Sequence, residues 1–402
     1  MLKLSSGRSS HLSKLDEDNL LVIVDNNLDG ISINKIDNNL IKVASSKIKI
    51  SDDVSDIFED SIVVGDRIFI LSFRNDINSF HLLTVLDKET LEPFTSFKIS
   101  SVIKEFNLHK LHTDGEYIYA FGDIGLNKIC VLKINKDLTE KSITIIDHPE
   151  VFLNIMHVEM FGNLIYMTVC NTNKIDDLRI LVIDKSAFEL KRIISIQVKH
   201  INGVSSVAIH HTVLKYSNDS LFIVMNISES SDRNKRKNYS LIFKLNFEFE
   251  ILESISLGSD KGLFTITNIN IGNKITLSGF SKTTKKGFFL SMNEDFSDIM
   301  NTDNIDFIKA AKPGKYSVSA CELSDDQTFF LTSYFGEVEE ENYNQLDKNI
   351  PMVRSTKMSQ NNVILSMEPE DIKKYSVFTS SSIKINPFFD HHLNKIFNKG
   401  VM

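Results

Sequence analysis

A strand followed by a short hydrophilic turn recurs seven times along this chain of 402 residues. Each copy is an alternating apolar run that ends at an Asp, Asn or Glu. Asp and Asn suit this position because their side chains accept hydrogen bonds from backbone N–H groups two residues on and so close a turn. We expect the apolar residue three or four positions later to begin the next strand. The strand ends are Asp37, Asp87, Asn135, Asp184, Asn246, Asn293 and Glu368, and the apolar residues are Leu40, Leu91, Leu138, Phe188, Phe249, Phe296 and Ile372.

A tight turn followed by a strand of β-branched and aromatic residues precedes each of these copies. Pairs of Gly, Asn and Asp favour tight hairpin turns because such turns need positive φ angles. Successive turns lie 47, 49, 48, 56, 54 and 53 residues apart. The turn pairs begin at Asp18, Gly65, Asp114, Gly162, Asn218, Gly272 and Asp325.

Each unit therefore contains four strands joined by a tight turn, a variable loop and an Asx turn. Four antiparallel strands repeated radially are the plan of a β-propeller, whose closure removes exposed sheet edges. The sequence predicts an all-β, seven-bladed propeller over residues 1–386 and a short helical tail over 387–402. Two packed β-sandwiches are the alternative, but they would not need the same order of turns seven times. The expected blades span approximately 8–51, 55–100, 105–147, 152–198, 204–258, 262–307 and 315–385.

Over nearly its whole length the chain resembles the broad β-propeller repeat superfamily, with WD40-like and YVTN-like architecture. The Gly-His and Trp-Asp signatures of WD40 repeats are absent, as is the paired glycine of kelch repeats, and the chain has no tryptophan. The resemblance therefore implies an architecture and no particular function.

The seventh unit is irregular because residues 334–358 form an insertion between its second and third strands. We assign Val363–Leu365 to the third strand rather than to an eighth unit, although Asn361 and Asn362 resemble a tight turn. In the tail, apolar residues at helical spacing predict a short amphipathic helix that caps the propeller or docks on a partner. They are Phe389, Leu393, Ile396 and Phe397.

Composition narrows the range of partners and compartments. A net charge of −8 argues against general binding to nucleic acid, which needs clustered Lys and Arg over a broad face. No apolar run approaches the roughly 18 residues of a membrane-spanning helix, and no signal peptide is recognisable. Cys130, Cys170 and Cys321 have no metal-ligand spacing and are expected to be reduced core thiols. We expect a cytoplasmic protein with no cofactor, no nucleic-acid partner and no membrane partner.

The loops that join second and third strands carry the strongest charge contrast. Loops on a rigid scaffold often hold binding sites, and complementary charge steers a partner. We therefore predict that this rim binds another protein; the alternatives are solvated loops, or basic and acidic loops that pair with each other. In the fifth unit the loop from Ser228 to Tyr239 carries Arg233, Lys235, Arg236 and Lys237, the sixth adds Lys282, Lys285 and Lys286, and the seventh carries Glu337, Glu339, Glu340 and Glu341.

Polar residues also recur on the expected first strands, at similar distances before the tight turns. Such side chains could line a central channel, where neutral imidazole can bind a metal or polarise a substrate. A hydrated channel lining without chemistry is the alternative. The residues are Asp60, His109, His157, His211 and Thr267.

One segment copies the beginning of a calcium-binding loop, with Asp25, Asn27 and Asp29 at alternate positions before Gly30. The later ligand positions are occupied by Ile33 and Ile36, which have no oxygen to bind calcium, so a calcium site is not favoured. No nucleophile elbow, zinc-protease motif or phosphate loop is present. Our leading hypothesis is a non-enzymatic protein-interaction scaffold. The alternatives are an enzyme or a small-ligand or metal binder that uses the channel mouth, and a carbohydrate-binding propeller.

Overall fold

The computed structural model describes the chain over nineteen segments and places only strands and turns in them. No helix long and apolar enough to cross a membrane occurs among these residues. The chain divides into two compact units: Met1–Glu150 with Ala320–Tyr334 and Lys374–Met402, and Val151–Ser319 with Phe335–Lys373. The described segments are 9–25, 30–39, 41–48, 56–74, 79–101, 106–125, 128–147, 152–171, 174–198, 206–232, 235–259, 264–281, 286–297, 300–301, 317–324, 327–333, 353–357, 363–366 and 383–387.

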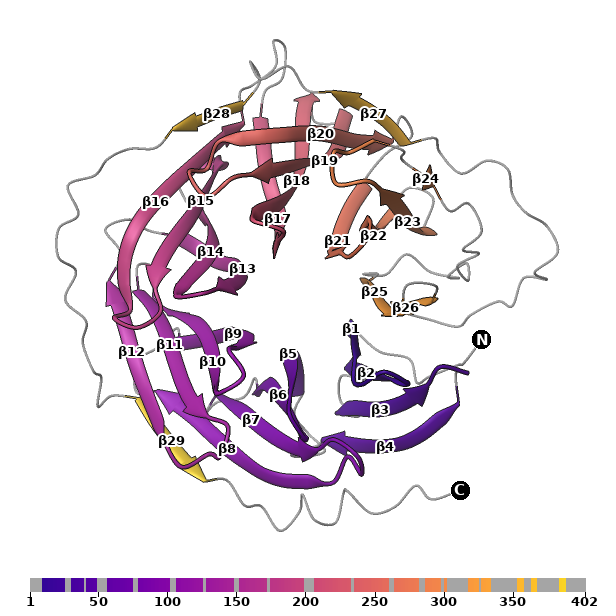
Figure 1. Ribbon diagram of the computed structural model, residues 1–402. Helices are drawn as coiled ribbons and strands as arrows, with labels where there is room; N and C mark the ends of the chain where they lie inside the picture. The colour runs from indigo at the N-terminus through magenta and orange to yellow at the C-terminus, as the bar shows by residue number, and fades with distance from the viewer. Residues whose placement is uncertain are drawn as a thin grey trace. The chain divides into compact units, whose positions relative to one another are not determined.

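The first unit contains three antiparallel sheets built from consecutive strands, which we call blades 1 to 3 (Figure 1). Blade 1 is β1 (Ser9–Lys14), β2 (Asn19–Asp25), β3 (Ile31–Asp37) and β4 (Lys42–Ile48). Blade 2 is β5 (Asp56–Val64), β6 (Arg67–Arg74), β7 (Phe80–Asp87) and β8 (Pro93–Ser101). Blade 3 is β9 (Phe106–Thr113), β10 (Tyr117–Ile124), β11 (Lys128–Asn135) and β12 (Lys141–Asp147).

The second unit contains blades 4 to 6, which follow the same strand order. Blade 4 is β13 (Phe152–Phe161), β14 (Leu164–Asn171), β15 (Lys174–Asp184) and β16 (Glu189–Val198). Blade 5 is β17 (Ser206–Ser217), β18 (Ser220–Asp232), β19 (Lys235–Leu245) and β20 (Ile251–Ser259). Blade 6 is β21 (Phe264–Ile271), β22 (Ile275–Ser281), β23 (Lys286–Met292) and β24 (Met300–Asn301). The chain is a β-propeller of four-stranded antiparallel blades, which confirms the predicted architecture.

The predicted count of seven blades is wrong for the described residues, which form six. The seventh unit contributes only a two-stranded sheet, β25 (Ser317–Ser324) with β26 (Gln327–Ser333). Its expected third strand, Val363–Ser366 or β28, pairs instead with β16 of blade 4. Tight turns fix strand register in the other blades, whereas the insertion at 334–358 leaves this strand free to pair elsewhere.

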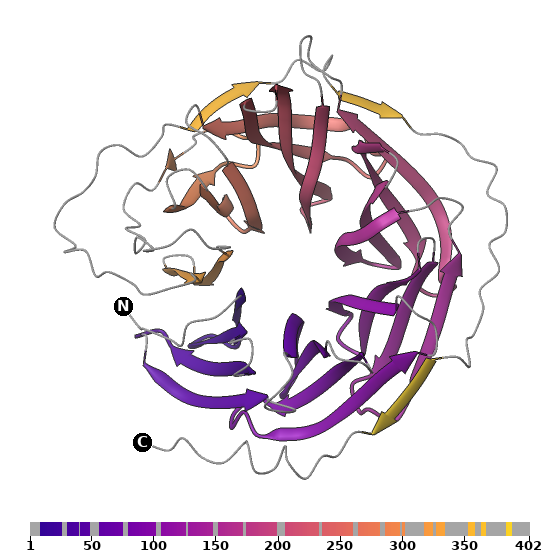
Figure 2. The ribbon, with the colours of Figure 1, turned by 180° about the vertical axis from the view of Figure 1, so that it is seen from behind.

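Two further short strands also add to the last strands of blades. β27 (Val353–Lys357) pairs with β20, and β29 (Ile383–Pro387) pairs with β8, both antiparallel. Both views show β27 along β20 and β28 along β16 (Figures 1 and 2). The predicted tail helix lies outside the described residues except for Pro387, which ends a strand, and no helix forms among the described residues.

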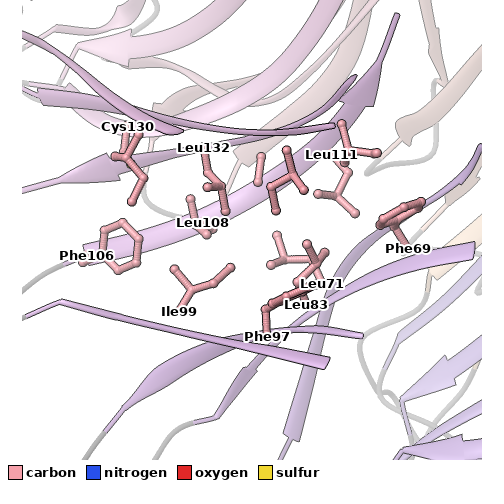
Figure 3. Close-up of a cluster of buried hydrophobic side chains, with 14 of the residues drawn as sticks. Phe69, Leu71, Leu83, Phe97, Ile99, Phe106, Leu108, Leu111, Cys130 and Leu132 are labelled. Atoms are coloured by element: carbon pink, nitrogen blue, oxygen red, sulfur yellow. The ribbon is translucent and has the colours of Figure 1, made fainter. Parts of the chain in front are cut away.

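Apolar side chains on both faces of the middle strands form the core between neighbouring blades. β7 is buried at seven of its eight positions, because one face packs on each neighbouring blade. Figure 3 shows the cluster between blades 2 and 3, to which Phe69, Phe97 and Leu108 belong. The free, buried thiol of Cys130 lies in the same cluster.

The Asx turns form as predicted, but the apolar residue within them does not begin the next strand. Asp87 Oδ1 accepts the N–H groups of Glu89 and Thr90 at 3.0 and 2.8 Å, and Asp184 Oδ1 accepts those of Ser186 and Ala187 at 2.9 and 3.0 Å. The apolar residue is instead a turn residue with a left-handed backbone. The φ angles are 59° at Leu91, 65° at Leu138, 52° at Phe188, 65° at Phe249 and 58° at Phe296.

Burial explains why large residues adopt this unfavourable conformation. Leu91 is 1% exposed and Phe249 is 6% exposed. The Phe249 ring lies 6.2 Å from the Tyr166 ring of blade 4, so the turn of blade 5 inserts its side chain between the two blades. A left-handed backbone costs a non-glycine residue roughly 1–2 kcal/mol, which burial of the ring offsets.

At Phe249 we expect the glycine variant to be more stable than the alanine variant, which is the reverse of the usual order within a strand. Phe249→Ala should lower the free energy of unfolding by about 3–5 kcal/mol, because it leaves a cavity. Phe249→Gly should be less destabilising by about 1 kcal/mol, because glycine adopts positive φ without strain. Urea denaturation of the two variants measures the difference.

Phe243 is the matched control, because it is equally buried but lies within β19. There glycine should be worse than alanine by roughly 0.5–1 kcal/mol. The same order of stability at both positions would contradict a left-handed turn at Phe249.

Candidate functional site

A β-bulge interrupts the first strand of five blades at one equivalent position. The ladder between first and second strands shifts there by one residue, so the register skips one residue of the first strand. A bulge bends the strand and redirects its side chains. The bulge residues are Glu59 on β5, His109 on β9, Met156 on β13, His210 on β17 and Thr267 on β21.

The bulges correct the predicted alignment of channel residues. His109 and Thr267 are bulge residues, whereas Asp60, His157 and His211 each follow one. The five residues are therefore not in equivalent registers. Counting back from the turns could not detect this difference of one residue.

His109 lies between two carboxylates at the bulge of blade 3. Its Nε2 is 2.7 Å from Asp123 Oδ1 on β10, and its Nδ1 is 3.9 Å from Glu59 Oε2 on β5. Asn107 Nδ2 donates to the other oxygen of Asp123 at 3.2 Å. Burial disfavours the charged ring, but the hydrogen bond to Asp123 and the negative charges of Asp123 and Glu59 outweigh it and raise the pKa of His109 to about 9. His109 is therefore a cation at neutral pH.

In four of the five bulged blades, a backbone group of the residue just before the bulge contacts a side chain of the preceding blade. Asn226 of blade 5 shows this best: its Oδ1 accepts the N–H of Ile266 at 2.8 Å, and its Nδ2 donates to the carbonyl of Ile266 at 2.7 Å. In blade 3, Leu108 N–H donates to His81 Nε2 of blade 2 at 3.1 Å. Burial lowers the pKa of His81 to about 3, so its ring is neutral and Nε2 can accept this bond.

Weaker contacts occupy the same position in two other blades. Phe58 N–H points to Asp25 Oδ2 of blade 1 at 3.4 Å, and Cys170 Sγ of blade 4 lies 3.9 Å from the carbonyl of Ile209. First strands are sheet edges, so their outward N–H and C=O groups need such partners. The links therefore close the seams between consecutive blades of each unit.

The other predicted channel residues have local partners. Asp60 Oδ2 accepts the N–H of Leu111 in blade 3 at 2.9 Å. Asn226 Nδ2 lies 3.5 Å from His211 Nδ1, and Thr267 Oγ1 donates to the carbonyl of Ser278 at 3.3 Å. The carbonyl of His157 accepts the hydroxyl of Thr168 at 3.4 Å.

The described residues contain no group of three or more His, Cys, Asp or Glu side chains placed to hold a metal ion. Asp25, from the calcium-loop candidate, is 1% exposed and bonded to blade 2, while Asn27 and Asp29 lie outside the described residues.

The basic loop predicted for blade 5 is a paired hairpin rather than a loop. β18 and β19 remain in register to Asp232 opposite Lys235, and β17 pairs with β18 as far as Ser206 opposite Ser230. We call residues 227–240 the blade-5 arm. Arg236 lies opposite Ser230 and Lys237 opposite Glu229, while Arg233 lies outside the described residues.

The bulges provide a common origin for measuring how far the arm projects. The second strand runs three residues past the bulge in blades 2, 3, 4 and 6, ending at Arg74, Ile124, Asn171 and Ser281. In blade 5 it runs six residues past Asn226, to Asp232. Three more residues extend the strand by about 10 Å. The acidic residues Glu337, Glu339, Glu340 and Glu341 of the seventh unit, and Lys282 and Lys285 of the sixth, lie outside the described residues, and Lys286 begins β23.

No protein-family model and no curated protein matches this chain. Among solved structures it resembles the WD40 domain of SCAP from fission yeast, at 10% identity over 83% of this chain and 91% of that one, with a TM-score of 0.42. It also resembles SapL1 lectin, at 11% identity over 74% and 96% of the two chains with a TM-score of 0.37. A prolyl endopeptidase is similar at 9% identity over 78% and 52%, with a TM-score of 0.45. These likenesses concern the fold alone. The strand order of the chain itself shows a β-propeller of four-stranded antiparallel blades.

The charge on His109 should make stability depend on pH above neutrality. Because the folded pKa of about 9 exceeds the ordinary value of 6.5, the stabilisation is complete below pH 6.5 and is lost as pH rises through 9. His109→Gln should therefore lose more stability relative to the native chain at pH 6 than at pH 10. Urea midpoints at several pH values measure this difference.

His112→Gln serves as the matched control on the same strand, where the His112 ring hydrogen bonds with the backbone of Thr113. Its effect should not follow the pH dependence of His109→Gln. A His109→Gln effect that stays constant from pH 6 to pH 10 would show that the ring is not charged in the fold.

Asn226→Ala should lower the free energy of unfolding by about 1–3 kcal/mol, because it leaves buried backbone groups of Ile266 without partners. Ser240→Ala removes one hydroxyl that donates to Asn226 Oδ1 at 2.6 Å and should cost roughly 1 kcal/mol. Urea denaturation gives both values, and the reverse order would contradict the role of Asn226 as the seam residue.

Proposed function

We propose that this propeller is a non-enzymatic scaffold that binds a partner protein through the blade-5 arm. The observation that carries the proposal is the length of β18, which runs six residues past the bulge rather than three. The antiparallel ladder pairs the backbone of the arm as far as Asp232 opposite Lys235, so residues 235–237 belong to a strand rather than to a loose loop. Preorganised loops and strands lose less entropy on binding.

The charge of the arm suggests what it binds. Residues 232–237 contain four basic residues and one acidic residue, in a chain whose net charge is −8. A local positive site attracts an acidic surface of a partner, whereas the rest of this negatively charged protein repels that surface. The partner is therefore steered toward the site. The partner we propose is therefore a protein with an acidic patch. The prediction from the sequence that the partner also contacts acidic residues of the seventh unit remains a prediction. These residues are Glu337, Glu339, Glu340 and Glu341.

The geometry around His109 gives less support to an enzyme or a metal site. A histidine held as a cation by two carboxylates has no free lone pair for a metal and cannot act as a general base at neutral pH. We propose the cytoplasm as the compartment, where the buried thiols of Cys130 and Cys170 would remain reduced.

The test reverses the charges of the arm in the full-length chain. In Lys235→Glu/Arg236→Glu/Lys237→Glu, the partner captured by the native chain should bind with an on-rate at least about tenfold lower at low salt. A photoreactive amino acid at Asn234 identifies the partner by crosslinking and mass spectrometry, and surface plasmon resonance measures the rate.

The matched control is Lys42→Glu/Lys136→Glu/Lys191→Glu, which changes the net charge equally at three exposed positions. It should bind like the native chain, with both triple variants unfolding at the native urea midpoint. Equal losses in the two variants, or no loss in either, would refute binding through the arm.

A further inference from the structure

The last strand of a blade is a sheet edge, and three of these edges already accept a strand from the chain itself. β27, β28 and β29 add antiparallel to β20, β16 and β8. All three obey one register: the first residue of the added strand lies opposite the last residue of the blade. The pairs are Val353 with Ser259, Val363 with Val198, and Ile383 with Ser101.

The spacing of these added strands follows the order of the blades in reverse. β27 on blade 5 begins at Val353, and β28 on blade 4 begins ten residues later, at Val363. β29 begins a further twenty residues later, at Ile383, and lies on blade 2, which is two blades before blade 4. One blade therefore corresponds to ten residues of chain. The next step leads from blade 2 to blade 1 and from Ile383 to Leu393.

Blade 1 offers a matching edge. Among the described residues, no strand pairs with the outer side of β4. At its beginning Ile41 is 61% exposed and Val43 is 56% exposed. A bare strand edge that carries exposed apolar residues favours pairing with another strand. The edge belongs to the same compact unit as β29.

We propose that the C-terminal residues Leu393–Phe397 dock on β4 as the fifth strand of blade 1, with Leu393 opposite Ile48. The segment begins with an apolar residue, as β27, β28 and β29 do. Five residues separate it from β29, the same number that separates β27 from β28. In this register Ile396 lies opposite Ser45, an exposed residue of β4.

Tethering favours this occupant over a separate chain. A short linker gives the tail an effective concentration in the millimolar range at the edge, without any new contact. The four added strands would then cover the last-strand edges of blades 1, 2, 4 and 5 with one continuous stretch of chain. This inference does not rest on the blade-5 arm. The test of partner binding and the test of tail docking can therefore succeed or fail independently.

The test is disulfide crosslinking in the full-length chain. Ser45→Cys with Ile396→Cys should form an intramolecular bond under mild oxidation, identified by mass spectrometry of the digested protein. Ser100→Cys with Lys384→Cys is the positive control, because Lys384 lies opposite Ser100. Ser45→Cys with Val401→Cys is out of register and should lose the crosslink, because opposed Cβ atoms must lie about 4 Å apart.

Any other result of the crosslinking test contradicts the proposal. A crosslink in the positive control but not in Ser45→Cys/Ile396→Cys would place the tail elsewhere, for instance in the amphipathic helix that its spacing also permits. Crosslinked dimers would make a second copy the occupant. As an independent measurement, Ile396→Pro should increase hydrogen exchange in residues 42–48 and leave blade 2 unchanged, since proline lacks the N–H needed for the ladder. Unchanged exchange in residues 42–48 would also refute docking.

Discussion

Each of the six described blades has a first-strand and a last-strand edge, and the way in which the backbone groups of these edges find partners organises the structure. On the first-strand side, buried polar side chains of the preceding blade supply the partners. Asn226 serves both the N–H and the carbonyl of Ile266, and His81 accepts from Leu108. The recurring bulge is the local distortion associated with these contacts, since the bonded residue directly precedes it. On the last-strand side, short strands from residues 353–387 take the same role.

Packing between blades depends on a second repeated device, the left-handed apolar residue of the Asx turn. The Asp or Asn side chain closes the turn, and the turn then directs Leu91 or Phe249 into the seam between blades. The strain of a positive φ is accepted because a large side chain becomes buried there. Hydrogen bonds and apolar contacts therefore meet at the same seams, which ties the formation of each blade to the presence of its neighbour.

The sequence was sufficient for the architecture because its strongest signals are local. Turn pairs such as Asp114-Gly115 and Asx positions such as Asp87 dictate hairpins through side-chain and backbone chemistry alone. It was insufficient where register depends on distant partners. The poor alternation of β9 reflects the bulge at His109, and the residue just before that bulge, Leu108, bonds to His81 in another blade. Val363–Ser366 resembles a third strand in isolation, yet a long insertion lets it pair with β16.

The seams also change how polar residues on first strands should be interpreted. Polar side chains can satisfy the backbone groups of a neighbouring strand edge, so a polar residue on a first strand does not by itself indicate catalysis. Asp60 illustrates this, because its carboxylate accepts the N–H of Leu111. The blade-5 arm is different, since four blades close with three residues beyond the bulge and the fold therefore does not require six. A feature that stability does not explain is the better guide to function, and in this molecule that feature is a braced basic hairpin on an acidic protein.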